Sequence, residues 1–125
     1  MKSVRSTGNP TLAQRARWDD IREMGCVCCR INGIVRLPEI HHMRVGGKHG
    51  QKRLGHDFTF GLCAWHHRGE NAWGSEGRGN FTYGPSFALE PARFRKLFGS
   101  QEELLEFQNL LIAGLREIRK VRAAA

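Results

Sequence analysis

Two pairs of metal-binding residues constrain the fold of this chain more strongly than any other feature of its sequence. Each pair has two residues between its members: Cys26 and Cys29 form the first, and Cys63 and His66 form the second. Thiolate and imidazole are the ligands that zinc prefers, and four of them close a tetrahedral site. The spacing therefore predicts one structural zinc ion that joins two segments distant in the sequence.

The size of the chain would give such an ion a large share in folding. With 125 residues, 15 glycines and a hydrophobic share of 40%, the chain is expected to form one small domain with a thin core. A structural metal ion would then supply much of the folding free energy. We expect a single domain over residues 10–125, preceded by a disordered basic arm over residues 1–9.

The four cysteines favour metal binding over disulfide bonds, because three of them lie within four positions. Adjacent Cys28 and Cys29 cannot bridge each other without strain. The sequence leaves open whether Cys28 replaces one of the named zinc ligands. Residues 1–17 lack the apolar segment of a signal peptide, and no apolar run approaches the roughly 18 residues of a membrane span. We therefore expect a protein of the reducing cytoplasm with no membrane role.

The formal net charge of +8 indicates a polyanionic partner, although a merely soluble surface is the alternative. Cations gather in a glycine-rich segment, residues 44–57, which we expect to be a loop. Glycine lets the backbone approach a phosphate while the cations neutralise it; the alternative is a flexible basic loop without a ligand. The candidate nucleic-acid contacts in this loop are Arg44, Lys48, Lys52 and Arg53.

A loosely helical pattern covers residues 10–24, before the first ligand pair. Two starts fit this helix: Asn9 as a cap before proline, or a capping box of Thr11 and Gln14. Gly25 is expected to end it.

Two short strands and a helix are predicted around the second ligand pair. Residues 33–40 are expected to form a strand or hairpin leg whose end carries His41 and His42. Residues 58–62 are expected to form the second strand, and a short helix is expected over residues 66–71.

The C-terminal part is expected to end in a long helix. Residues 70–86 are rich in glycine without a clear period, and the apolar residues of segment 85–98 indicate core contacts under a short helix. Ser100 and Glu103 form a capping box for a helix over about residues 100–122. The helix carries an apolar seam of Leu104, Phe107, Leu111, Leu115 and Ile118. This seam predicts packing within a monomer or, alternatively, a weak dimer.

Histidines beyond the four zinc ligands provide material for a second metal site. His41 and His42 are adjacent, and His67 follows directly after His66. A second, open metal site is a place where phosphodiester chemistry can occur.

The arrangement of these residues resembles the ββα-metal core of HNH endonucleases. In the zinc-pinned form of that motif, a Cys-x-x-Cys pair precedes the first strand. A metal ligand followed by histidine ends the strand, and Leu-Cys-x-x-Cys-His opens the helix. The matching stretches are Cys-Val-Cys-Cys at residues 26–29, Ile-His-His-Met at 40–43 and Leu-Cys-Ala-Trp-His-His at 62–67. The resemblance implies a small α+β fold: a zinc-stabilised ββα-metal core with flanking N- and C-terminal helices and long glycine-rich loops.

The resemblance also implies a role for each matched residue. The structural zinc would be held by Cys26, Cys29, Cys63 and His66. His41 and His67 would bind a catalytic divalent ion, which could be Mg²⁺, Mn²⁺ or Zn²⁺, and His42 would be the general base. Asn71 follows His67 by four residues, so on a helix it would share the same face, where such nucleases often carry a third ligand.

Two positions depart from the HNH pattern. His66 replaces the usual second cysteine of the helix pair, which zinc tolerates. The mid-motif asparagine that ties the loop in many members has no clear match, and Asp57 and His56 are the nearest candidates. Asp57 could also orient a histidine. Arg68 fits a phosphate clamp as well as it fits an ordinary surface arginine.

A narrower resemblance is to the recombination enhancement function (Ref) nucleases, a phage-encoded group of this superfamily. It covers roughly residues 20–110, and it includes Ile-His-His at 40–42, Gly-Gln-Lys at 50–52, His-Asp at 56–57, Leu-Cys at 62–63 and His-His-Arg-Gly at 66–69. This resemblance implies a DNA endonuclease that acts in recombination with RecA, in the cytoplasm of a bacterial host.

The implied reaction is hydrolysis of a phosphodiester bond. His42, unprotonated near neutral pH, would take a proton from the attacking water, and the divalent ion would offset the charge on the leaving 3′ oxygen. The alternative is a zinc-stabilised nucleic-acid-binding or RecA-interaction module without catalysis. Such a module would not need His42.

Overall fold

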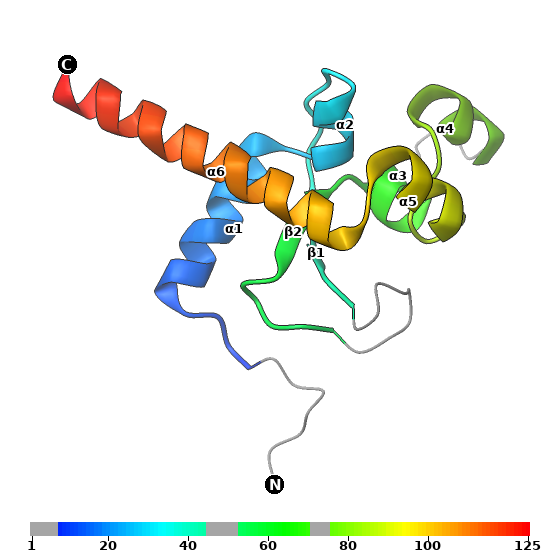
Figure 1. The fold of residues 1–125 in the computed structure, drawn as a ribbon, viewed down its shortest axis with the longest axis horizontal. Helices are drawn as coiled ribbons and strands as arrows, with labels where there is room; N and C mark the ends of the chain where they lie inside the picture. The colour runs from blue at the N-terminus through cyan, green and yellow to red at the C-terminus, as the bar shows by residue number, and fades with distance from the viewer. Residues whose placement is uncertain (1–7, 45–52, 71–75) are drawn as a thin grey trace, which may run out of the picture.

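The computed structural model describes residues 8–44, 53–70 and 76–125, in which a two-stranded antiparallel sheet is surrounded by helices (Figure 1). The strands are β1 (Glu39–His42) and β2 (Thr59–Leu62). The helices are α1 (Leu12–Met24), α2 (Val27–Ile31), α3 (Ala64–Arg68), α4 (Glu76–Tyr83), α5 (Pro91–Phe98) and α6 (Gln101–Ala124). The predicted small α+β class is confirmed. Most of the predicted basic arm and most of the predicted loop over residues 44–57 lie outside the described residues.

The β1–β2 ladder is four residues long on each strand, and β1 includes both His41 and His42. The sequence predicted a strand or hairpin leg over residues 33–40 whose end carries the two histidines. The histidines do lie at the end of the strand, but the predicted start is wrong, because the strand begins at Glu39. The preceding segment does not extend the ladder, because the Arg36 carbonyl accepts a hydrogen bond from the Cys26 backbone N–H (3.0 Å). This segment therefore supports the turn of the first ligand pair.

Side chains of two helices cover the edge of β2 that faces away from β1. Gln108 of α6 accepts a hydrogen bond from the Gly61 backbone N–H (2.9 Å), and Arg17 of α1 donates to the Thr59 carbonyl. A Cβ atom at Gly61 would lie 2.9 Å from Cγ2 of Ile21, so α1 packs closely against the strand at this point. All four residues of β2 are buried.

Helix α1 begins at the predicted capping box. The Thr11 side chain accepts from the Gln14 backbone N–H (3.1 Å), and the Gln14 side chain accepts from the Thr11 N–H (2.9 Å). The alternative start with Asn9 as the cap is therefore wrong. Gly25 ends the helix with a φ of 87°, as predicted, and a Cβ atom there would lie 3.0 Å from the Arg36 carbonyl.

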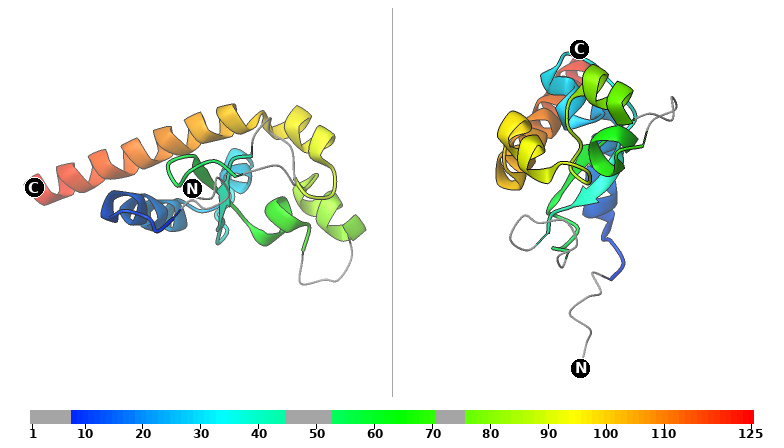
Figure 2. Two further views of the ribbon diagram at one scale, coloured as in Figure 1. Left: turned by 90° about the horizontal axis from the view of Figure 1, so that it is seen from below. Right: turned by 90° about the vertical axis from the view of Figure 1, so that its right-hand side faces the viewer.

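Helix α6 begins at the predicted capping box of Ser100 and Glu103. Its first half packs on the core through residues such as Leu104, which is buried, whereas Ile118 near the other end is 50% exposed. The first part of the predicted seam therefore packs within the same chain. The last turns of α6 extend beyond the rest of the structure (Figures 1 and 2). Among the described residues, no helix is both long enough and apolar enough to span a membrane.

Two short helices differ from the predictions. Helix α3 starts at Ala64 rather than His66, because Cys63 caps it, and it ends at Arg68 because Gly69 adopts the left-handed conformation (φ 74°). Helix α4 lies in a segment for which no regular structure was predicted. A Cβ atom at Gly79 would lie 2.6 Å from the Trp65 ring, so this glycine permits close packing of α4 on α3.

Candidate metal centre and active site

Cys26, Cys29, Cys63 and His66 form a buried group that could hold a metal ion, because their ligand atoms all lie within 4.8 Å of one another. The Cys29 and Cys63 sulfur atoms are 3.8 Å apart, and His66 Nδ1 lies 3.2 Å from the Cys63 sulfur. A zinc tetrahedron with Zn–S bonds of about 2.3 Å has S···S edges of about 3.8 Å. The four residues that the spacing selected therefore converge with dimensions that fit zinc.

Both ligand pairs lie at the start of a short helix, which explains their spacing. Cys26 is the N-cap of α2, and its sulfur accepts from the Cys29 backbone N–H at 3.5 Å. Cys63 is the N-cap of α3, and its sulfur accepts from the His66 N–H at the same distance, 3.5 Å. The second ligand of each pair thus lies in the first helical turn, beside the sulfur that caps it.

The tautomer of His66 is set from outside the cluster. Its Nε2 donates to the Tyr83 carbonyl (2.9 Å), so Nδ1 is the nitrogen that faces the sulfur atoms and would bind a metal ion. Burial lowers the pKa of His66, but hydrogen bonds with Cys26 and Cys63 outweigh burial and raise the pKa to about 10. Hydrogen bonds with Cys26 and Cys63 also raise the pKa of the Cys29 thiol. A bound zinc ion would neutralise the charge of the cysteine thiolates that hold it.

Cys28 lies outside the ligand group. Its side chain is fully buried in the hydrophobic core, and burial raises the pKa of its thiol. Among the described residues, the group that could hold an ion therefore includes Cys26 and Cys29, and Cys28 is not part of it.

His41 has one nitrogen that is hydrogen-bonded and one that is not. Gln101 contacts the first nitrogen, Nε2. The Gln101 side-chain oxygen accepts from the Arg44 backbone N–H (3.1 Å), and its amide nitrogen donates to the Arg44 carbonyl (3.2 Å). The atom that faces His41 Nε2, at 3.1 Å, is therefore the oxygen. Nε2 must therefore carry the hydrogen. Nδ1 is buried and has no hydrogen-bond partner in the described part of the chain. His41 thus presents an unpaired lone pair inside the protein.

His67 of α3 lies beside His41, with ring centroids 5.1 Å apart. Its Nδ1 lies 2.8 Å from a Glu39 carboxylate oxygen, so Nδ1 donates and Nε2 is left as an acceptor. The pKa of Glu39 is lowered, first by its hydrogen bonds with Arg68 and then by that with His67, against the effect of burial. A strand and a helix therefore bring together two histidines, each with one nitrogen available to a ligand.

His42 has different neighbours from His41, because adjacent residues of a strand point to opposite faces. Its ring contacts Trp18 and His56, and Arg53 donates a hydrogen bond to its Nδ1 (2.8 Å). Burial, followed by the charge of Arg53, lowers the pKa of His42 to about 4. The imidazole is therefore neutral near pH 7.

The predicted nucleic-acid contacts are described only in part. Arg44 and Arg53 face each other across an isolated antiparallel β-bridge. Arg68 is held by two carboxylates, with 2.6 Å contacts to both Glu39 and Glu70. This pairing fits the surface-arginine alternative better than the phosphate clamp. Lys48 and Lys52 lie outside the described residues.

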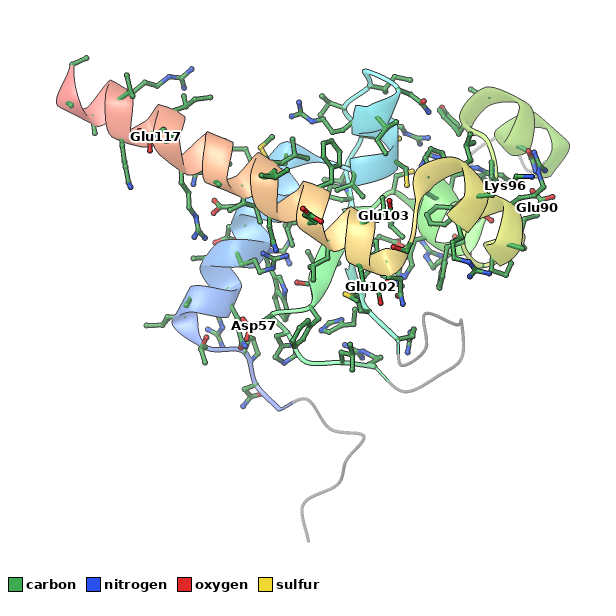
Figure 3. All side chains as sticks on the ribbon, in the orientation of Figure 1. Asp57, Glu90, Lys96, Glu102, Glu103 and Glu117 are labelled. Atoms are coloured by element: carbon green, nitrogen blue, oxygen red, sulfur yellow. The ribbon has the colours of Figure 1, made fainter. Side chains whose placement is uncertain are left out.

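Asn71 also lies outside the described residues, but the argument that placed it can be corrected. It required one helix to carry both His67 and Asn71, whereas α3 ends at Arg68. Asp57, the other suggested partner of a histidine, lies close to α1 (Figure 3), where its charge acts on Arg17. Of the two candidates, Asp57 and His56, it is His56 that contacts His42.

Sequence reasoning missed Glu39 and Gln101. A local signal existed for Glu39, because it precedes His41 by two positions and alternate residues of a strand share a face. Gln101 contacts His41 across 60 positions, so no short motif could have indicated it.

Comparison with protein families gives a match to the family described as recombination enhancement, RecA-dependent nuclease, over residues 10–113. The match runs from the start of α1 into α6 and includes every candidate site residue named above. Comparison with individual curated proteins gives no match. Because the family match covers most of the chain, the protein belongs to the recombination enhancement, RecA-dependent nucleases.

Proposed function

We propose that the protein is a phage-encoded, metal-dependent DNA endonuclease of HNH type that acts in recombination with RecA, in the cytoplasm of a bacterial host. The observation that carries this proposal is the pairing of His41 and His67. Each ring is hydrogen-bonded through one nitrogen, which leaves the second nitrogen for an ion. The strand and helix that supply them correspond to the two elements of the ββα-metal motif that would hold a catalytic ion.

The residues present fit a divalent ion. A buried acceptor without a partner is costly, and a metal ligand would remove that cost at His41 Nδ1. Burial lowers the pKa of His41 to about 3, so the ring is in the neutral form that metals require. Within the described ranges, no third His, Cys, Asp or Glu side chain joins His41 and His67 in a compact ligand group, and Asn71 stays a candidate for that place.

The proposed mechanism divides the work among the side chains. An ion at this site would supply Lewis-acid stabilisation of the scissile phosphate and the leaving oxygen. His42 would take the proton from the attacking water with an unprotonated ring nitrogen. Arg44, Arg53 and the lysines of the loop would hold the phosphate backbone. Glu39 would keep His67 in the tautomer and orientation that leave Nε2 free.

The proposal is tested by nicking of supercoiled plasmid with the purified protein, with and without RecA, in a series of divalent ions. His41→Ala and His67→Ala are expected to lose cleavage at low metal concentration and to recover part of it in excess metal, because each removes one ligand. Both variants should keep DNA affinity, measured by fluorescence anisotropy.

Tight DNA binding by the wild-type protein without cleavage in any ion, with RecA present, would contradict the proposal. That result would favour the zinc-stabilised binding module.

DNA affinity is expected to fall steeply with salt, because the loop binds phosphates. Counterion release gives a log-log slope of about −0.9 per duplex phosphate neutralised, or about −0.7 for single strands, so a slope of several units is expected. The double change Lys48→Glu and Lys52→Glu should flatten the slope and weaken binding to unrelated sequences alike. Lys96→Glu on α5 (Figure 3) reverses one charge outside the loop and serves as the control for charge reversal itself.

A slope near zero would show that phosphate contacts do not dominate. Discrimination among sequences that survives the double change would lead to the same conclusion.

A further inference from the structure

One continuous chain of hydrogen bonds passes through the proposed general base. The Gly8 carbonyl lies 2.8 Å from His56 Nε2, and His56 Nδ1 lies 2.9 Å from His42 Nε2. At the other end, a terminal nitrogen of Arg53 lies 2.8 Å from His42 Nδ1 and 3.1 Å from His42 Nε2. Every ring nitrogen of the two histidines therefore has a partner.

The contact between the Gly8 carbonyl and His56 fixes the position of each hydrogen in this series of hydrogen bonds. A backbone carbonyl can only accept, so the His56 tautomer carries its hydrogen on Nε2 and accepts at Nδ1. His42 must then donate from Nε2, which leaves the lone pair on Nδ1. A guanidinium group can only donate, and its nitrogen is nearer to Nδ1 than to Nε2, so the assignment is fixed from the Gly8 end.

Packing holds the two rings in this relation. His42 and His56 are only 8% and 7% exposed, and the Trp18 indole contacts both rings edge-on, at centroid distances of 5.9 and 5.0 Å. The Thr59 hydroxyl donates to the His56 carbonyl (2.9 Å) and accepts from Trp18 Nε1 (3.3 Å). The position of His56 is therefore determined by α1 and by the start of β2.

We propose that His56 is a positioning residue for His42: it keeps the hydrogen on His42 Nε2, so that Nδ1 is the atom that takes the proton from water. This inference rests on the proposed function, because it names the reacting nitrogen of the proposed base. A neutral imidazole that exchanges between tautomers presents the required nitrogen only part of the time.

Arg53 gives the arrangement a second consequence. In this structure its guanidinium group lies beside the ring nitrogen that the reaction needs. DNA offers a stronger acceptor, because hydrogen bonds between arginine and phosphate are charge-assisted. A bound phosphate would therefore draw Arg53 away and open Nδ1 to water.

The test compares two substitutions of His56, one that removes the hydrogen-bond acceptor for His42 Nε2 and one that keeps an acceptor there. His56→Phe keeps a ring but removes the acceptor for His42 Nε2, so kcat should fall about 10- to 100-fold while KM for DNA stays unchanged. His56→Asn keeps an oxygen acceptor near the place of Nδ1 and should recover most of the rate. In nitrogen NMR of histidine-labelled wild-type protein, His42 should show a protonated Nε2 and an unprotonated Nδ1.

A hydrogen on His42 Nδ1 in the wild-type spectrum, or a wild-type kcat for a folded His56→Phe protein, would overturn the inference. Zinc content and melting temperature check the fold of both variants; if His56→Phe unfolds, the wild-type tautomer decides. Failure of the proposed function would be seen separately, as a wild-type protein that does not cleave DNA or a His42→Ala variant that cleaves normally.

Discussion

Replacement of Cys29 or Cys63 by serine is expected to release the zinc ion and unfold the domain. Structural zinc sites contribute about 10–16 kcal/mol to folding, whereas the stability of a whole domain is about 5–15 kcal/mol. The two cysteines come from opposite halves of the ligand group, with sulfur atoms 3.8 Å apart, so either loss separates α2 from α3. Zinc content by atomic absorption and melting by circular dichroism measure the effect.

Cys28→Ala is the matched control, because Cys28 is equally buried and adjacent to Cys29 but lies outside the ligand group. This variant should keep its zinc and melt cooperatively. One tightly held zinc ion and an unchanged melt in both serine variants would remove the assignment of the site.

His42→Ala is expected to abolish DNA cleavage while fold and DNA affinity persist. A general base typically supplies roughly 10² to 10⁴ in rate and contributes little to ground-state binding, so the loss should appear in kcat. The assay is single-turnover cleavage of labelled DNA at saturating metal, accompanied by zinc content and melting temperature.

His49→Ala removes a histidine that has no assigned role, and it controls for a general effect of histidine loss. Cleavage by His42→Ala at the wild-type rate would show that the catalytic assignment is wrong. If excess metal restored DNA cleavage by His42→Ala, the result would instead indicate that His42 is a metal ligand.

The parts of the fold that the sequence predicted depend on short spacings. A cysteine three positions before a second ligand can cap the turn that carries that ligand, and this occurs at both Cys26 and Cys63. The capping boxes that start α1 and α6 have the same short range. Local chemistry decides such features, so the sequence records them.

The rest depends on contacts between distant segments or on packing. His56 meets Gly8 across 48 positions, and no local pattern indicates that contact. Two glycines had effects opposite to those predicted. Gly79 lies within a helix, at a point where the Trp65 ring leaves no room for a side chain. Gly69 ends α3, so that helix does not reach position 71. In each case a neighbour outside the local segment, or one left-handed residue, overrode the apparent pattern.

The covered edge of β2 has a consequence for how the protein can associate. A two-stranded sheet normally leaves backbone groups open to pairing with a strand from another chain. Here the Gln108 amide occupies the Gly61 N–H and the Arg17 guanidinium occupies the Thr59 carbonyl, as a third strand would. Strand exchange and fibril-like addition are therefore blocked at this edge. A protein partner that adds a strand cannot use this edge.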